Sequence, residues 1–405
     1  MKIQIIPHRL KGTVAAPPSK SMAHRLLICG GLAHGKKSVI HGISDSEDVT
    51  ATLRCLSAIG ATYEKHGDIV EIIGTDVRNI CPKETLPCNE SGSTLRFFIP
   101  LCLHCDKTIS LSGTKKLLSR PLGIYETICH EQNIFYSHTE DVFTIKGKIS
   151  AGEYKIPGNI SSQFISGLLF ALPLCEADST ISIIPPIESR SYLNLTMEAL
   201  DAFGIHIQWL DDKTLYIKGN QHYIPSDVSV EGDYSNAAFF HALKLFGNDI
   251  SITGLSETSK QGDKAYLPFF ETLSKGTPTI HIGDCPDLGP ILMAVAAAKN
   301  GAVFCGTKRL KIKESDRGAA MAEELAKFGV SVTVNEDSII VYPVKFHAPT
   351  ETLHGHNDHR IVMALATLLT LTGGTIDGAE AVKKSLPEYF ELLRSIGAEV
   401  IIHET

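Results

Sequence analysis

Six short, mostly β-branched runs that end in glycine or proline organise this chain, and the first reads Ser38-Val39-Ile40-His41-Gly42. The later copies are Ile109-Ser110-Leu111-Ser112-Gly113, Ile181-Ser182-Ile183-Ile184-Pro185, Ile250-Ser251-Ile252-Thr253-Gly254, Val303-Phe304-Cys305-Gly306 and Thr375-Ile376-Asp377-Gly378. Their last residues stand at positions 42, 113, 185, 254, 306 and 378, which gives steps of 71, 72, 69, 52 and 72 residues. A nearly constant step indicates a repeated supersecondary unit, with one shortened copy.

Each run has an apolar helix pattern before it and an amphipathic one after it. The apolar patterns include 161–174, 233–245 and 287–299, and the amphipathic ones 49–60, 193–204, 319–329 and 389–397. Strand-like pairs such as 331–334 and 339–342 follow, so the unit is interpreted as β-α-β-α-β-β. A unit of this size cannot bury its helices and sheet alone. Six units in 405 residues therefore predict two similar α/β domains of three repeats each.

Composition excludes several classes of protein. With 38 Lys+Arg against 45 Asp+Glu, the formal charge of −7 disfavours nucleic-acid and membrane-surface partners. No stretch approaches the roughly 20 apolar residues of a membrane span, and the N-terminus is too short for a signal peptide. The ten scattered cysteines indicate buried thiols of a reducing compartment, so we expect a cytoplasmic protein. The CxxC motif at Cys102 and Cys105 has no second pair at metal-ligand spacing and is interpreted as core.

The apolar helices all start with small or polar residues. These starts are Pro18-Ser19-Lys20-Ser21, Glu90-Ser91-Gly92-Ser93, Asn159-Ile160-Ser161-Ser162, Gly232-Asp233-Tyr234-Ser235, Pro286-Asp287-Leu288-Gly289 and Asn357-Asp358-His359-Arg360. Backbone N–H groups at a helix start attract anions. If the six starts face one place, they form an anion site; taken one at a time, each could be an ordinary helix cap.

Basic residues recur at equivalent points of the repeats. Lys20, Arg25, Arg96 and Arg360 lie within or beside the apolar helices, and Arg120, Arg190, Lys384 and the segment 311–317 follow the glycine- or proline-ended runs. A charge inside an apolar helix is costly unless it is paired or serves a site. These cations predict a ligand with several negative charges, although a solvated surface position remains the alternative for any one of them.

Two carboxylates are the acid–base candidates. Asp287 opens an apolar helix, and Glu314 lies between Lys313 and Arg317. A carboxylate among cations stays ionised, which suits a base; for Asp287 the alternative is a plain helix cap. Among the histidines only His359 stands out, beside an acid and an arginine. No nucleotide-binding, hydrolase or metalloprotease motif occurs in a fitting context, so we expect chemistry without a metal or cofactor.

Five segments together resemble the 5-enolpyruvylshikimate-3-phosphate synthase family. They are Pro18-Ser19-Lys20-Ser21 with Arg25, Ser161-Ser162-Gln163-Phe164, Glu231-Gly232-Asp233-Tyr234-Ser235, Lys313-Glu314-Ser315-Asp316-Arg317 and Asn357-Asp358-His359-Arg360. The resemblance covers the chain from end to end. The enolpyruvyl transferases that act on UDP-N-acetylglucosamine share the fold but lack two of these patterns, and they usually carry a reactive loop cysteine.

The resemblance implies a two-domain inside-out α/β barrel of six βαβαββ repeats. Residues 1–18 and 232–405 would form a discontinuous C-terminal domain and residues 19–231 the N-terminal domain, with the active site in the cleft between them. The implied reaction transfers the enolpyruvyl group of phosphoenolpyruvate to the 5-hydroxyl of shikimate 3-phosphate and releases phosphate. It is a step towards chorismate and the aromatic amino acids. We expect a monomer with these two small-molecule substrates.

The resemblance also assigns site residues. Shikimate 3-phosphate would contact Lys20, Ser21, Arg25, Ser161, Ser162, Gln163, Ser189, Tyr192, Asp287 and Lys313. Phosphoenolpyruvate would contact Lys20, Gly92, Arg120, Gln163, Arg317, Arg360 and Lys384. Asp287 would accept the proton of the 5-hydroxyl, while Lys20 and Glu314 are both candidates for proton transfer at the methylene carbon.

Three positions depart from the usual family pattern. Glu90 places a carboxylate near the expected phosphoenolpyruvate site, Arg309 stands where many members have Asn, and His24 replaces a frequent Asn. Gly92 is retained, so we expect glyphosate to inhibit in competition with phosphoenolpyruvate. Two alternatives stay open: transfer to a UDP-sugar, which a change of acceptor would reveal, and a non-catalytic anion-binding protein, which would bind substrates without turnover.

Overall fold

The computed structural model describes residues 1–80, 82 and 84–403, and the chain divides into two compact units. Unit 1 contains residues 1–19 and the chain from Gly232 onward, and unit 2 contains Lys20–Glu231. The first boundary lies one residue from the position expected from the sequence. Each unit has its own hydrophobic core, built around Phe97 and Phe164 in unit 2 and around Phe304 and Tyr389 in unit 1.

The sheets of unit 2 share one plan, in which each glycine- or proline-ended run is the second of four strands. The runs that end at Gly113 and Pro185 pair in parallel with the strand before their apolar helix, whereas the run that ends at Gly42 pairs in parallel with the later strand Asp227–Ser229. All three runs pair antiparallel with the second strand of a hairpin. The three sheets, in strand order, are β10 (Glu153–Pro157), β11 (Ser179–Ile184), β13 (Thr214–Ile217) and β12 (Ile207–Trp209); β6 (Leu86–Pro87), β7 (Thr108–Ser112), β9 (Val142–Lys146) and β8 (Phe135–His138); and β14 (Asp227–Ser229), β3 (Lys37–His41), β5 (Ile69–Ile73) and β4 (Thr62–His66).

Unit 1 repeats the plan with two variations. Its sheets are β16 (Thr279–His281), β17 (Ala302–Cys305), β19 (Ser338–Val341) and β18 (Val332–Val334); β20 (Leu353–His354), β21 (Gly374–Asp377), β1 (Lys2–Ile6) and β22 (Glu399–His403); and β15 (Asp249–Thr253) with β2 (Lys11–Ala15). The N-terminal strand β1 fills the hairpin position of the last repeat. The sheet of β15 has two strands because its repeat has no hairpin, which explains the 52-residue step.

The chain passes from one unit to the other twice. Each time, the strand before the passage pairs within the unit that the chain is leaving. β2 precedes α1 (Lys20–Leu32) in the sequence but pairs in parallel with β15 of unit 1. β14 precedes α8 (Tyr234–Leu245) but pairs in parallel with β3 of unit 2. Within unit 1 the crossing segments meet at an antiparallel bridge between Pro18 and Gly232, and the Asp233 N–H donates to the Pro17 carbonyl at 2.7 Å.

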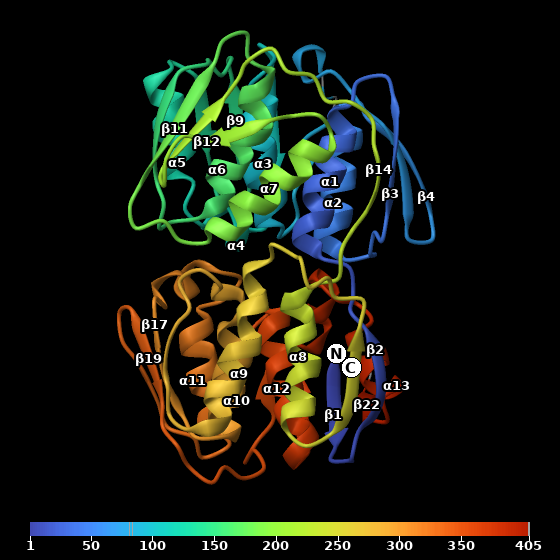
Figure 1. Ribbon diagram of the computed structural model, residues 1–405, viewed down its shortest axis with the longest axis vertical. Helices are drawn as coiled ribbons and strands as arrows, with labels where there is room; N and C mark the ends of the chain where they lie inside the picture. Colours follow the sequence, from blue (N-terminus) through green and yellow to red (C-terminus); the bar gives the residue numbers. More distant parts are fainter. Residues whose placement is uncertain (81, 83, 404–405) are drawn as a thin grey trace. The chain divides into compact units, whose positions relative to one another are not determined.

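One apolar helix per repeat is buried, as the sequence predicts. These helices are α1, α3 (Gly92–Cys102), α6 (Ser162–Ala171), α8, α10 (Gly289–Ala298) and α12 (His359–Thr372). Within unit 2, α3 packs against α6, and within unit 1, α12 packs against α8 and α10 (Figure 1). With sheets outside and helices inside, each unit is an inside-out α/β barrel of three repeats.

The remaining helices lie between the runs and the hairpins or in connections. The α-helices are α2 (Glu47–Ala58), α4 (Lys115–Leu118), α5 (Gly123–Glu131), α7 (Arg190–Ala202), α9 (Tyr266–Lys275), α11 (Arg317–Ala326) and α13 (Tyr389–Ser395). The 3₁₀ turns are η1 (Val77–Asn79), η2 (Leu172–Leu174), η3 (Gly262–Ala265), η4 (Pro286–Leu288), η5 (Lys308–Ile312) and η6 (Ala379–Lys384). No helix in the described part of the chain is long and apolar enough to cross a membrane.

The cysteines follow the sequence prediction. The nine described cysteines form no disulfide with one another, and all but the half-buried Cys305 are buried. Burial raises the pKa of the Cys102 thiol in the CxxC motif well above its usual value. Such a thiol behaves as a small apolar core residue. Cys81 lies outside the described residues.

Candidate active site

Arg317 joins three carboxylates in unit 1. It is the first residue of α11, and its side chain is 1% exposed. Its Nε donates to Asp358 Oδ2 at 2.8 Å, its Nη1 to Asp287 Oδ1 at 2.8 Å and its Nη2 to Glu314 Oε2 at 2.7 Å. We call the group Asp287, Lys313, Glu314, Arg317, Asp358 and Arg360 the Arg317 cluster. A buried guanidinium with this many carboxylate partners is fixed in place.

Asp287 is the carboxylate with the most cationic partners in the Arg317 cluster. Lys313 Nζ lies 3.1 Å from Oδ1, and Arg360 Nη2 lies 3.4 Å from Oδ2. Burial opposes ionisation of Asp287, but Arg360, Lys313 and Arg317 outweigh it and hold its pKa well below the usual value. Asp287 belongs to the turn η4, and Leu288 occupies the N-cap position of α10.

The start of α12 brings further groups to this cluster. Asp358 is fully buried, caps the helix by accepting from the Arg360 N–H at 2.9 Å, and also accepts from Ser315 Oγ at 3.0 Å. Arg360 Nη1 donates to Ser235 Oγ at 2.6 Å. Lys384, at the end of η6, donates to the Asn357 carbonyl at 2.6 Å. Buried His359 has its Nδ1 4.0 Å from Asp358 Oδ1.

In unit 2, Lys20 contacts one carboxylate and Arg25 contacts neutral oxygen atoms. Lys20, the first residue of α1, donates from Nζ to Asp48 Oδ2 at 2.8 Å. Arg25 is 3% exposed and donates to Thr196 Oγ1 at 2.8 Å and to the carbonyls of Ser21 and Tyr192 at 2.7 and 3.2 Å. Burial lowers the pKa of Arg25 to about 10, so the side chain stays cationic at neutral pH.

Gln163 gathers a second group of residues in unit 2. Its Oε1 accepts from Arg96 Nη1 at 2.7 Å, and its Nε2 donates to Ser93 Oγ at 2.9 Å. A β-carbon placed on Gly92 would lie 3.0 Å from Arg96 Nη1, 3.1 Å from Arg120 Nη1 and 3.6 Å from Gln163 Oε1. We call Gly92, Arg96, Arg120 and Gln163 the Gln163 cluster. Glycine at position 92 lets two guanidinium groups and an amide converge.

The predicted serine and tyrosine contacts stand at helix starts. Ser161 caps α6 by accepting from the Gln163 N–H at 3.3 Å, and Ser162 is buried beside it. Ser189 is fully buried in a left-handed conformation with φ 59°, immediately before α7. Tyr192 lies in the first turn of α7, and its ring centroid is 5.9 Å from the guanidinium carbon of Arg25.

Comparison with known proteins identifies the family. The family model described as EPSP synthase (3-phosphoshikimate 1-carboxyvinyltransferase) matches residues 5–274 and 269–393. Relatives named 3-phosphoshikimate 1-carboxyvinyltransferase from Clostridium perfringens (strain ATCC 13124) and Clostridioides difficile (strain 630) are 39% and 40% identical, over 98% of both chains in each case. The chain belongs to the EPSP synthase family. This membership confirms the resemblance on which the sequence prediction rests.

Solved structures confirm the fold class. An EPSP synthase from Acinetobacter baumannii superposes with a TM-score of 0.78 over 99% of this chain and 100% of that one, at 22% identity. The enolpyruvyl transferase NikO from Streptomyces tendae superposes with a TM-score of 0.76 over 99% and 98%, at 15% identity. The two-domain inside-out α/β barrel of EPSP synthases and related transferases is therefore the fold of this chain.

The structure groups most of the predicted EPSP synthase site residues. In unit 1, Asp287, Lys313, Glu314, Arg317 and Arg360 form one cluster, with Lys384 held to the Asn357 carbonyl. In unit 2, Gly92, Arg120 and Gln163 converge on one another. The hydrogen bonds that Arg25 donates to Ser21 and Tyr192 are accepted by their backbone carbonyls.

The sequence did not predict the partners of four candidate-site residues. Asp48 pairs with Lys20, Asp358 with Arg317, Thr196 with Arg25, and Arg96 with Gln163. The sequence places Arg96 within an apolar helix and Asp358 at a helix start, but it indicates a partner for neither. Each of these pairs is separated by at least 28 residues, so no local spacing could reveal it.

The structure shows the surroundings of the three residues that depart from the family pattern. His24 is buried, its Nδ1 lies 2.7 Å from Thr52 Oγ1, and burial first, then Lys20 and Arg25, lower its pKa well below its usual value. Arg309 is buried in η5 and donates to the Gly283 carbonyl at 3.2 Å. Glu90 is half-buried directly before the cap residue Ser91.

Proposed function

We propose that this chain transfers the enolpyruvyl group of phosphoenolpyruvate to the 5-hydroxyl of shikimate 3-phosphate with release of phosphate. The observation that carries the proposal is the Arg317 cluster, in which three cations hold the half-buried Asp287 in its ionised form, in a chain of the EPSP synthase family. The transfer needs a proton acceptor beside groups that bind anions, and this cluster supplies both.

The two substrates are assigned by charge and by family position. For shikimate 3-phosphate we propose contacts with Lys20, Ser21, Arg25, Ser161, Ser162, Gln163, Ser189, Tyr192, Asp287 and Lys313. For phosphoenolpyruvate we propose contacts with Lys20, Gly92, Arg120, Gln163, Arg317, Arg360 and Lys384. Within the second set, Arg317 and Arg360 suit the carboxylate because a guanidinium binds it with two parallel hydrogen bonds, and Arg120 and Lys384 suit the phosphate.

The reaction proceeds by addition and then elimination. A proton adds to the methylene carbon of phosphoenolpyruvate, and the 5-oxygen attacks the adjacent cation-like carbon while its own proton passes to Asp287. The methyl group then loses a proton, the double bond re-forms, and the bond from carbon to the phosphate oxygen breaks. Lys20 and Glu314 are the proposed groups for proton transfer at the methylene carbon.

The cations around Asp287 suggest how its basicity is adjusted. Arg317 and Arg360 both contact Asp287, and Arg317 also holds Glu314. A substrate carboxylate that takes hydrogen bonds from these arginines weakens their hold on Asp287 and displaces Glu314. The loss of cationic contacts raises the pKa of Asp287 towards that of an effective base and frees Glu314 for proton transfer.

Phosphate release from purified protein tests the proposal. Phosphoenolpyruvate is supplied with and without shikimate 3-phosphate, in EDTA, and we expect release only when both are present. Release that depends instead on UDP-N-acetylglucosamine would replace the acceptor. Binding of both substrates without any release would refute transfer and favour a non-catalytic protein. Inhibition by glyphosate, a monomeric state and a cytoplasmic location remain predictions.

A further inference from the structure

A turn with strained backbone positions the groups at the start of α12. It begins at His354, the last residue of β20, and spans residues 354–358; we call it the His356 turn. His356 and Asn357 both have a left-handed backbone, with φ 49° and 51°. This conformation costs a non-glycine residue on the order of 1 kcal/mol. Two such residues in succession persist only where the surroundings fix them.

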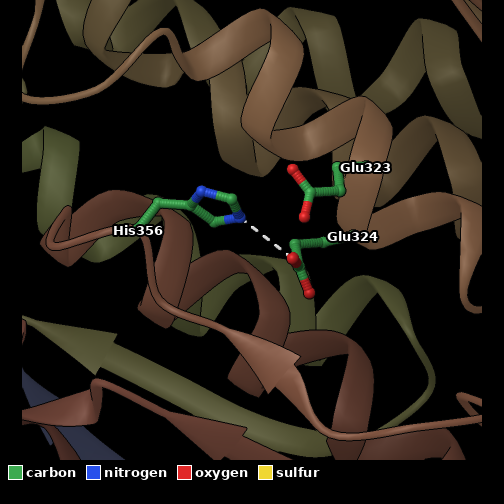
Figure 2. A group of neighbouring side chains, drawn as sticks. All are labelled: Glu323, Glu324 and His356. Carbon is green, nitrogen blue, oxygen red and sulfur yellow. Dashed lines mark hydrogen bonds and ion pairs between the residues drawn. The ribbon is translucent and has the colours of Figure 1, made fainter.

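Glu324 of α11 is the group that fixes the turn. Its side chain is fully buried, and its Oε2 accepts from the His354 N–H at 2.9 Å while its Oε1 lies 2.9 Å from His356 Nε2 (Figure 2). Lys327 Nζ donates to both oxygens at 3.0 and 2.9 Å. Burial opposes ionisation of Glu324, but His356, the His354 N–H and Lys327 outweigh it and lower its pKa.

The far end of the His356 turn carries groups assigned to phosphoenolpyruvate. The Asn357 carbonyl accepts from Lys384, Asp358 accepts from Arg317, and Arg360 follows two residues later. α11 therefore holds the turn twice, through Arg317 at its first residue and through Glu324 two helical turns further on. A shift of the turn displaces the carbonyl that holds Lys384 and the helix start that carries Arg360.

We infer that Glu324 and His356 are positioning residues for phosphoenolpyruvate, acting through the His356 turn on Lys384 and Arg360. The inference rests on the proposed roles of those two cations. Glu323, Glu324 and His356 also lie close enough together to hold a metal ion. The Lys327 ammonium on both Glu324 oxygens disfavours that reading, because it already supplies the positive charge there.

Steady-state kinetics of Glu324→Gln test this inference. The amide keeps the size of the side chain but removes its charge and one acceptor. The hydrogen bonds that fix the His356 turn therefore weaken. We expect the KM for phosphoenolpyruvate to rise about tenfold, equivalent to roughly 1.4 kcal/mol, with less than a twofold change in the KM for shikimate 3-phosphate. A purely structural role would change both constants together or neither.

A second variant and a control complete the design. His356→Asn keeps a residue that tolerates the left-handed backbone but removes the contact with Glu324, and we expect the same selective rise. Glu323→Gln, one residue away and exposed, should match the wild type. An unchanged KM for phosphoenolpyruvate in both Glu324→Gln and His356→Asn, or an equal rise for the two substrates, would overturn the inference.

Lys384→Met separates this inference from the proposed site. A large rise in the KM for phosphoenolpyruvate in Lys384→Met, with none in Glu324→Gln, would refute the positioning role and leave the site intact. No rise in Lys384→Met would refute the assignment of Lys384 itself, and the positioning inference would fall with it.

Discussion

The candidate-site cations of unit 1 are held mainly by carboxylates, whereas those of unit 2 are held mainly by neutral oxygen atoms. Arg317 contacts three acids, and Arg25 contacts a hydroxyl and two carbonyls. A cation with neutral partners keeps its full charge for a ligand, while carboxylates paired with cations supply groups for proton transfer. The difference predicts that the cations of unit 2 contribute mainly to binding of shikimate 3-phosphate and that the carboxylates of unit 1 contribute mainly to proton transfer.

Among the candidate-site cations of unit 2, Lys20 differs from Arg25 and Arg96 because its partner Asp48 is an acid. We therefore expect Lys20→Met to lower kcat by about 10²- to 10⁴-fold, the range typical of a lost general acid or base. Phosphate release under saturating substrates measures the effect. Lys37→Met is the matched control, since Lys37 makes an exposed pair with Glu71 at the same 2.8 Å. Wild-type turnover in folded Lys20→Met would remove Lys20 from the mechanism.

Replacing Arg25 should change affinity rather than turnover. Hydrogen bonds to charged groups contribute about 1.5–3 kcal/mol each, so Arg25→Met should raise the KM for shikimate 3-phosphate by roughly 10- to 100-fold. We expect kcat at saturation to change much less. Arg78→Met, which removes an exposed guanidinium paired with Asp76 in the same unit, is the control. A fall in kcat with unchanged KM would contradict the anion-binding role of unit 2.

Gly92→Ala tests the convergence of the Gln163 cluster. The added carbon would lie 3.0–3.1 Å from Arg96 and Arg120, so one guanidinium must move by a few tenths of an ångström. We expect a several-fold rise in the KM for phosphoenolpyruvate, measured at saturating shikimate 3-phosphate. Gly123→Ala adds a carbon with no neighbour within 4 Å and should leave both constants unchanged. Equal effects of the two substitutions would argue against a packed anion site at Gly92.

The pH dependence of the free energy of unfolding, compared between wild type and Asp287→Asn, should show the smallest of these effects. The folded-state pKa of Asp287 lies well below 3.8, so its ionised form stabilises the fold above its unfolded pKa of about 3.9, and this contribution is lost as pH falls through the folded value. The urea midpoints of wild type and Asp287→Asn should therefore converge as pH falls from 6 to about 3. A constant difference over that range would show that the carboxylate charge contributes nothing to stability.

The repeat pattern predicted most of the fold because burial and spacing are local signals. The six runs, the buried helices and the strand pairs are all visible as periodic apolar residues. The sequence did not predict that β2 pairs with β15 and β14 with β3, because long-range packing determines which strands pair. Likewise, the sequence picked out Asp287 and Arg317, but the contact of Glu324 with His356 joins two elements 32 residues apart.

Single-turnover phosphate release by Asp287→Asn tests the central claim most directly. With both substrates saturating, the account predicts a rate at least about 10²-fold below wild type, while calorimetry still detects binding of shikimate 3-phosphate through the cations of unit 2. A wild-type rate of phosphate release would contradict the account, because the proton of the 5-hydroxyl would then have another acceptor.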